Sequence, residues 1–152
     1  MEPLFVTKTK YTFEEYKKFC NIVNNRESKL KMKLIVAELI LLLAAFILQN
    51  VFLIVFVVIY PPILWLVQKG IIKKTYESNQ LFKDMELEFA FYDSYFLEKS
   101  VHGETKVEYS YLYKVLESDT NFYLMISKNQ GYIILKDNCS TELKKFIAEL
   151  KR

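Results

Sequence analysis

A continuous apolar stretch from Leu34 to Val67 constrains this chain more than any other feature of its sequence. It spans 34 residues and contains one charged side chain, Glu38. As one straight helix it would measure ~51 Å, whereas the hydrocarbon core of a bilayer is ~30 Å thick. The polar pair Gln49-Asn50 lies near its middle, and asparagine tolerates the left-handed backbone that a tight turn needs. The stretch therefore predicts two membrane-spanning helices joined as a hairpin.

A soluble helical hairpin, buried in a globular core, is the alternative. Both helices would then be apolar on every face, and the remaining chain is too short to cover them. The chain has 152 residues, of which 52% are hydrophobic and 26% charged, and this length fits a membrane segment with one small domain. The composition excludes a disordered chain, a collagen-like chain and a simple soluble enzyme domain. We therefore expect an integral membrane protein.

The flanks of the apolar stretch indicate its orientation. Lysines stand on both sides of it, whereas the turn carries no charge: Lys29, Lys31, Lys33, Lys69, Lys73 and Lys74. Basic flanks stay on the cytoplasmic side of a membrane. Since the start of the chain lacks the basic region and the cleavage site of a signal peptide, we expect the hairpin itself to target the chain. The predicted location is the cell membrane, with two spans (multi-pass) and both termini in the cytoplasm.

The net charge of +3 alone would suggest a nucleic-acid partner, but its distribution does not. Residues 1–33 carry eight basic and four acidic side chains, whereas residues 75–152 carry ten basic and thirteen acidic ones. The excess positive charge thus lies beside the apolar stretch, where lipid headgroups would be. The acidic C-terminal region has no basic stripe interleaved with aromatic residues. We expect the membrane, and no nucleic acid, as a partner.

Residues 1–30 predict a cytoplasmic arm made of a strand and a helix. Phe5–Tyr11 is rich in residues that favour strands. Thr12 and Glu15 match a capping box, in which each side chain bonds to the backbone amide of the other residue. The helix Phe13–Asn24 has an apolar face, which must be buried against the C-terminal domain, the membrane or a partner.

Residues 75–152 predict a cytoplasmic α+β domain. Alternating apolar and polar residues favour about five short antiparallel strands, and Ser140 can cap a closing amphipathic helix that extends to Glu149. The predicted strands are 87–91, Tyr95–Lys99, Lys106–Tyr111, Phe122–Ser127 and Tyr132–Leu135. The predicted fold class is therefore a membrane α+β protein, with a two-helix transmembrane hairpin at 31–69 followed by this domain.

Several segments of the C-terminal region resemble a known family. They are Phe91–Tyr95, Val107–Glu117, Phe122–Leu124 and Gly131–Lys136. They are similar to the YcxB-like family of small bacterial membrane proteins, although that family tends to have Trp where this chain has Tyr109 and Pro near Leu135. The resemblance implies that the C-terminal domain is similar to bacterial pleckstrin-homology-like (PH-like) domains. It implies no activity, because its motifs are structural.

The reactive side chains form no pattern that would carry catalysis. His102, the single histidine, lies in a predicted turn without a nucleophile or acid pattern beside it. Cys20 and Cys139 are far apart in the sequence, so we expect two reduced thiols and no metal site. Glu86 and Glu88 fit a solvated strand face, and the three glycines form no phosphate-binding loop. We expect no catalytic, cofactor-binding or metal-binding residues, and no cofactor.

Three features have both a functional and a structural interpretation. Glu38 is either a proton or cation site or a carboxyl group near the membrane interface. Pro61-Pro62 is either a simple bend in the second helix or part of a transport device. Tyr109, Tyr111 and Tyr113 form an aromatic stripe that either packs within the domain or docks a peptide or a lipid headgroup.

We therefore expect a non-enzymatic, membrane-anchored module whose cytoplasmic domain interacts with a protein or with the inner leaflet. A protein partner would be either another chain or a second copy of this one. The alternative is a small accessory subunit of an oligomeric membrane transport assembly, which would use Glu38 and the proline bend. A membrane enzyme is the least favoured class, and an apolar pocket with several convergent polar groups would be its sign.

Overall fold

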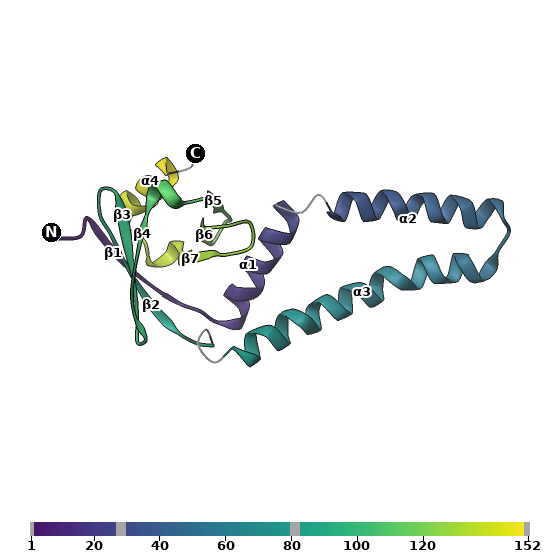
Figure 1. Ribbon diagram of the computed structural model, residues 1–152, viewed down its shortest axis with the longest axis horizontal. Helices are drawn as coiled ribbons and strands as arrows, with labels where there is room; N and C mark the ends of the chain where they lie inside the picture. Colours follow the sequence, from purple (N-terminus) through teal and green to yellow (C-terminus); the bar gives the residue numbers. More distant parts are fainter. Residues whose placement is uncertain (1, 27–29, 80–82, 151–152) are drawn as a thin grey trace.

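The computed structural model describes residues 2–26, 30–79 and 83–150, so Lys29, one of the predicted basic flanks, lies outside the described residues. Figure 1 shows a domain of strands from which a long pair of helices projects. The elements are β1 Phe5–Lys10, α1 Phe13–Arg26, α2 Leu30–Ile47, α3 Val51–Ser78, β2 Glu86–Phe91, β3 Tyr95–Ser100, β4 Gly103–Glu108, β5 Lys114–Glu117, β6 Asn121–Met125, β7 Gly131–Leu135 and α4 Thr141–Glu149. This order confirms an α+β protein with helices in its first half, antiparallel sheets and a C-terminal helix.

The described strands form two antiparallel sheets, with the orders β1-β2-β3-β4 and β5-β6-β7. Strand β1 pairs with β2 along its whole length, from Phe5 opposite Phe91 to Lys10 opposite Glu86. The strand of the N-terminal arm is therefore part of the same sheet as three strands from the C-terminal half. This pairing answers one question that the sequence left open, because it packs the arm against the C-terminal strands.

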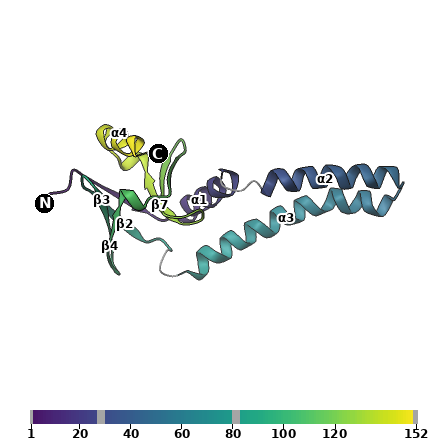
Figure 2. The same cartoon turned by 45° about the horizontal axis from the view of Figure 1, so that its top comes forward.

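The helices α1, α2 and α3 are inserted between two neighbouring strands of this sheet. The chain leaves the sheet at the end of β1 and returns to it at the start of β2, where the Asp84 amide donates to the Tyr11 carbonyl at 3.1 Å. Figures 1 and 2 both show α2 and α3 running away from the strands and back again. The helical pair is thus tied to the sheet through two covalent connections that emerge side by side.

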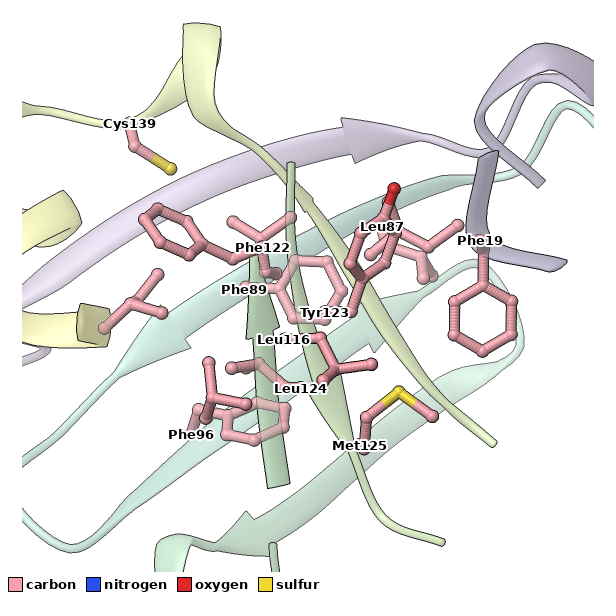
Figure 3. Close-up of a cluster of buried hydrophobic side chains, with 14 of the residues drawn as sticks. Phe19, Leu87, Phe89, Phe96, Leu116, Phe122, Tyr123, Leu124, Met125 and Cys139 are labelled. Carbon is pink, nitrogen blue, oxygen red and sulfur yellow. The ribbon is translucent and has the colours of Figure 1, made fainter. Parts of the chain in front are cut away.

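The core lies between the inner faces of the two sheets. Figure 3 shows Phe89 and Phe96 of the larger sheet close to Phe122 and Leu124 of the smaller one, and all four are buried. Helix α4 covers one end, since its Leu143 and Ile147 belong to the same cluster. Burying one such side chain stabilises the fold by ~1.5–3 kcal/mol. As predicted, the Ser140 hydroxyl caps α4 by accepting from the Leu143 amide at 3.1 Å.

Side chains of β1 join the two sheets along one edge. The Thr7 hydroxyl donates to the Asn138 carbonyl at 2.8 Å, and the Thr9 hydroxyl accepts from the Leu135 amide at 3.3 Å. Both threonines are buried. Since buried polar groups need partners, these bonds explain why threonine occupies inward positions of β1, and they close the domain around its core.

Some boundaries differ from the sequence predictions. The predicted strand Lys106–Tyr111 is wrong in its second half, because β4 ends at Glu108 and Tyr109–Tyr111 form a 3-10 turn. The chain must turn there to pass from one sheet to the other, and tertiary structure overrides the strand preference of tyrosine. Strand β5 was not predicted, because its four residues give too short an alternation.

Helix α1 also differs from its prediction in two respects. It continues past the Asn24-Asn25 pair to Arg26. The Thr12 hydroxyl accepts from the Glu15 amide at 3.4 Å, which is half of the capping box. The Glu15 carboxylate instead accepts hydrogen bonds from the Asn121 side-chain amide and from Lys18. Packing of α1 against β6 therefore takes the carboxylate away from the cap.

The turn between α2 and α3 lies at the predicted position. Gln49 adopts a left-handed backbone with φ of 49°, and the Asn50 side chain caps α3 by accepting from the Leu53 amide at 3.2 Å. Helix α3 then runs through Pro61-Pro62 without interruption and extends eleven residues beyond Val67, where the second span was expected to end. Polar residues after Val67 are compatible with a helix once it leaves an apolar environment, so hydropathy alone could not locate this end.

Helix α3 has the length and the composition to cross a membrane. At ~1.5 Å per residue, its 28 residues measure about 42 Å. Of the helices in the described part of the chain it alone meets this description, because α2 carries Lys31, Lys33 and Glu38 within its 18 residues. The large apolar side chains on both helices are nevertheless mostly exposed.

Candidate functional site

A cavity of about 470 Å³ lies where the helices meet the strands. Its walls come from Tyr11, which follows β1, from α1 and the end of α3, from β2 and β3, and from β7 with the turn before it. This size falls within the range of small-molecule sites. The residues that matter most for its chemistry are Tyr11, Tyr16, Tyr76, Glu98 and Tyr132.

Tyr76 fixes the end of α3 against this cavity. Its hydroxyl donates to the Tyr11 carbonyl at 2.9 Å and accepts from the Asp84 amide at 3.1 Å. Its ring lies 5.5 Å from the Phe13 ring and 5.7 Å from the Tyr16 ring. The side chain is buried although it lies on the helix that carries most of the exposed apolar surface. The geometry of the cavity therefore depends on how α3 is held.

Glu98 is the unusual residue of the cavity. It lies on β3 opposite Phe89 of β2 and Thr105 of β4, so it occupies the same face of the sheet as Phe96 and Leu87. Strand alternation makes this the inner face. Within β1–β4, all of which are described, Glu98 is the one charged residue on that face. Burial raises the pKa of its carboxyl group, and a hydrogen bond from the Thr105 hydroxyl opposes that rise in part.

Tyrosines line the same cavity as this carboxyl group. The Tyr11 hydroxyl accepts from the Ile133 amide at 2.9 Å. Burial raises the pKa of both Tyr11 and Tyr132, and the negative charge of Glu98 raises each further. Burial also raises the pKa of Tyr16 to about 12. All three therefore remain neutral phenols at pH 7, able to donate hydrogen bonds.

The cavity carries a single negative charge. Among the described residues that line it, none is basic, and the rest are tyrosines, apolar side chains and neutral polar groups. A half-buried carboxylate with aromatic rings around it attracts cations and repels anions. The arrangement thus suits an ammonium group better than a phosphate. It supplies no general base paired with a nucleophile.

A second, smaller cavity of about 360 Å³ lies beside the 3-10 turn and contains part of the predicted tyrosine stripe. The Tyr109 hydroxyl donates to the Tyr92 carbonyl at 2.8 Å, and its ring packs beside Phe96. Tyr111 and Tyr113 are exposed. Because the backbone turns here, the three tyrosines do not share one strand face, so the stripe expected from their spacing is not formed.

The other reactive side chains, His102, Cys20 and Cys139, line neither cavity. His102 is exposed in the turn between β3 and β4. Cys20 is half-buried and Cys139 is buried, neither forms a disulfide, and burial raises the pKa of both thiols. The described residues contain no group of three or more His, Cys, Asp or Glu side chains that could hold a metal ion.

Glu38 is half-buried on α2, one heptad before the buried Ala45, so both lie on the face turned toward α3. Counted from the Gln49-Asn50 turn, Glu38 and Pro61 are equally distant along the chain. In an antiparallel hairpin they therefore lie at the same depth. Neither residue lines the cavity.

Sequence reasoning missed Glu98. The signal was present, because Phe96 is an obvious core residue of its strand and a period of two places Glu98 on the same side. The carboxylates considered instead, Glu86 and Glu88, lie on the outer face, where Glu88 pairs with Lys8 at 3.3 Å. An inward carboxylate stands out only when the inner face of its strand is identified first.

The comparisons with known proteins agree with the sequence resemblance. The model of the YcxB-like protein family matches residues 91–150, which extend from the end of β2 through α4. Neither a curated protein nor a solved structure matches the chain. The matched segment includes Glu98 and Tyr132 but neither the helical pair nor β1. The resemblance is confirmed over those 60 residues, and the C-terminal region of this chain is YcxB-like.

Proposed function

We propose that the protein is a membrane-anchored, non-enzymatic module that presents a PH-like domain on the cytoplasmic side for interaction with a protein or with the inner leaflet. The observation that carries this proposal is the insertion of the apolar helices between β1 and β2. An anchor attached at both of its ends to adjacent strands holds the domain against the membrane surface. A flexible tether would not restrict the domain in this way.

The apolar surface of the helical pair supports a two-span anchor. The side chains of α2 and α3 are exposed over almost their whole length, which in water would create a very large apolar patch. Ala45 and Val57 are buried where the two helices pack together. The three charges of α2 lie in the half of the helix away from the turn, where they are close to the predicted membrane surface.

Trp65 and Lys69 support a membrane surface near the end of the apolar part of α3. The Lys69 Nζ lies 3.3 Å from the centre of the Trp65 ring. Tryptophan and lysine are both favoured at the headgroup level. From Asn50 to Lys69 the helix rises ~28 Å, which is close to the thickness of a hydrocarbon core. The last turns of α3 then lie among the headgroups, next to the cavity.

The PH-like assignment is supported by the arrangement of the strands. Four antiparallel strands are followed by three, and a C-terminal helix closes one end. A non-enzymatic role is supported by the chemistry of the side chains, since His102 is exposed in a turn and both thiols have raised pKa values. In this role the protein needs no catalytic residue and no cofactor.

Labelling in intact cells tests the anchor and its orientation. Leu48→Cys at the turn and His102→Cys in the β3–β4 turn are matched probes, both exposed, in a chain with Cys20→Ser and Cys139→Ala. A membrane-impermeant maleimide applied from outside should modify Leu48→Cys alone, and both probes should react after lysis. Modification of His102→Cys in intact cells, or loss of the chain from washed membranes, would reject the proposal.

A second candidate function, an accessory subunit of an oligomeric transport assembly, is favoured by one observation. Glu38 faces α3 at the depth of Pro61, where proline removes an amide donor and leaves the Val57 carbonyl without its usual partner. Glu38→Gln would then change proton-coupled flux in reconstituted vesicles, with Glu77→Gln, outside the apolar part, as the control. Identical flux for both variants and the native chain would remove this candidate.

A further inference from the structure

We propose that the cavity between the helices and the strands binds an organic ammonium group, with Glu98 as its counter-ion. This inference deepens the proposed function, because it names the chemistry that the domain recognises at the membrane surface. Two sources carry this chemistry, the ethanolamine or choline headgroup of a lipid and a free amine, and the experiment below distinguishes them.

The negative charge of Glu98 supports this proposal. Glu98 is a carboxylate on the inner face of a sheet, where the neighbouring positions on both sides are Phe89 and Thr105. Its strand neighbour Lys99 points to the outer face and pairs with Glu104 at 3.7 Å, so it does not compensate this charge. No described residue that lines the cavity carries a positive charge. A half-buried carboxylate in such surroundings is costly, and a bound cation would offset that cost.

The aromatic lining of the cavity also favours an organic cation. The rings of Tyr16, Phe19, Tyr76 and Tyr132 all contribute to its walls. Aromatic faces attract organic cations, and several rings around one carboxylate form the kind of cage that recognises ammonium groups. One carboxylate is too few for a divalent metal, which takes several oxygen ligands. The lack of a basic residue among the described lining residues argues against a phosphate as the group held inside.

The position of the cavity relative to the expected membrane surface suits a lipid headgroup. The cavity is lined by Thr75, Tyr76 and Asn79 at the end of α3. These residues lie six to ten positions beyond Lys69, or ~9–15 Å along the helix. Lys69 and Lys73 precede Tyr76 at intervals that place the three on one face of the helix. An ammonium headgroup in the cavity would thus have basic residues on the membrane side, where the phosphate of the same lipid would lie.

Binding of soluble amines to the full chain in detergent is the first test. The probes are glycerophosphoethanolamine and glycerophosphocholine, with glycerol phosphate as the probe that lacks an ammonium group. Calorimetry should detect the two amines only. Glu98→Gln, which keeps the shape but removes the charge, should weaken binding by about tenfold or more. Glu86→Gln, on the outer face of the same sheet, is the matched control and should bind as the native chain does.

Nanodiscs provide the second test. With the native chain, adding phosphatidylethanolamine to phosphatidylglycerol should raise the midpoint of thermal unfolding of the strands by roughly 3–6 °C. Glu86→Gln should show the same rise and Glu98→Gln none. A rise with soluble amines but not with the lipid supports the site and assigns its ligand to solution. If neither source stabilises the native chain, or if Glu98→Gln responds as the native chain does, the inference is wrong.

The two proposals fail in different ways. A chain that does not insert into nanodiscs contradicts the membrane anchor, while its amine binding in detergent still tests the cavity. A chain that inserts but ignores both amine sources contradicts the cavity alone. Circular dichroism of Glu98→Gln separates lost binding from lost folding, and we expect an unchanged fold because the substitution removes a charge from an inner face.

Discussion

The two halves of this molecule place the same kinds of side chain in opposite surroundings. In the strands, Phe89, Phe91 and Phe96 are fully buried, whereas Phe46 is 77% and Phe52 is 89% exposed on the helical pair. The larger sheet turns one face to the core and the other, which carries the pairs Lys8–Glu88 and Lys99–Glu104, to water. The helices are apolar on nearly every face because we expect lipid around them. This difference supports the proposed membrane anchor, in which the last turns of α3 lie where lipid and water meet.

Truncating one phenylalanine in each half should give the largest difference in the free energy of unfolding. Phe89→Ala would leave a cavity between the sheets and lower the free energy of unfolding by ~3–5 kcal/mol. Phe52→Ala removes the same atoms from an exposed position and should change it by less than about 0.5 kcal/mol. Denaturant unfolding of the full chain in detergent, followed by near-ultraviolet circular dichroism, measures both. Equal losses would show that Phe52 is buried against something other than detergent or lipid.

A charge in the middle of α3 should have the next largest effect. Val58→Lys would cost ~2.5–3.5 kcal/mol on insertion into a bilayer, whereas Ile71→Lys, beyond the expected membrane surface, should cost little. The fraction of chain that remains in alkali-washed membranes measures the difference. If Ile71→Lys is extracted as readily as Val58→Lys, the membrane surface lies further along α3 than Lys69.

The sequence predicted the helical pair better than the strands, for a physical reason. An apolar helical hairpin is a local property, readable from the run between Leu34 and Val67 and from the turn at Gln49-Asn50. The boundary between β4 and the 3-10 turn at Tyr109 depends on where the second sheet lies, and no local pattern contains that. The pairing of β1 with β2 is also non-local, since some 75 residues separate the two strands.

The candidate site was hidden from sequence reasoning for the same cause. Tyr11, Tyr76, Glu98 and Tyr132 lie far apart in the sequence, and none belongs to a recognisable motif. Alternation from Phe96 places Glu98 on the inner face, but only the register of β3 with β2 and β4 shows which residues lie beside it there. A binding site formed by several aromatic rings around one carboxylate depends on all of these residues together. No single one of them gives a recognisable signal in the sequence.

Removing the Tyr76 hydroxyl tests how the end of α3 is held against the strands. Tyr76→Phe loses the hydrogen bond to the Tyr11 carbonyl. The Asp84 amide loses the Tyr76 hydroxyl, one of its two acceptors. We expect a loss of ~1–2 kcal/mol and faster hydrogen exchange at the end of β1 and the start of β2. Tyr60→Phe, an exposed tyrosine of the same helix, is the control. Unchanged exchange in Tyr76→Phe would mean that packing of the ring alone holds α3.

The smallest expected effect is a pH dependence of folding that originates at Glu98. Its pKa is raised in the folded chain because burial disfavours the charged form. Such a carboxyl group costs nothing when it is protonated in both the folded and the unfolded chain. The native chain should therefore lose stability, relative to Glu98→Gln, as the pH rises from about 4 through the raised pKa.

The groups that face Glu98 do not obscure this measurement. Tyr11, just after β1, and Tyr132 on β7 have raised pKa values and stay neutral below pH 9, and Thr105 on β4 does not titrate. Unfolding midpoints of the native chain and of Glu98→Gln, measured between pH 4 and 8, should diverge as the pH rises. The buffers must be citrate and phosphate, because Tris and imidazole are themselves organic cations. Adding ethanolamine should bring the midpoints of the native chain and of Glu98→Gln together again, since a bound ammonium group offsets the cost of burying the charged carboxylate. Midpoints that differ by the same amount at every pH would mean that water already solvates this carboxylate.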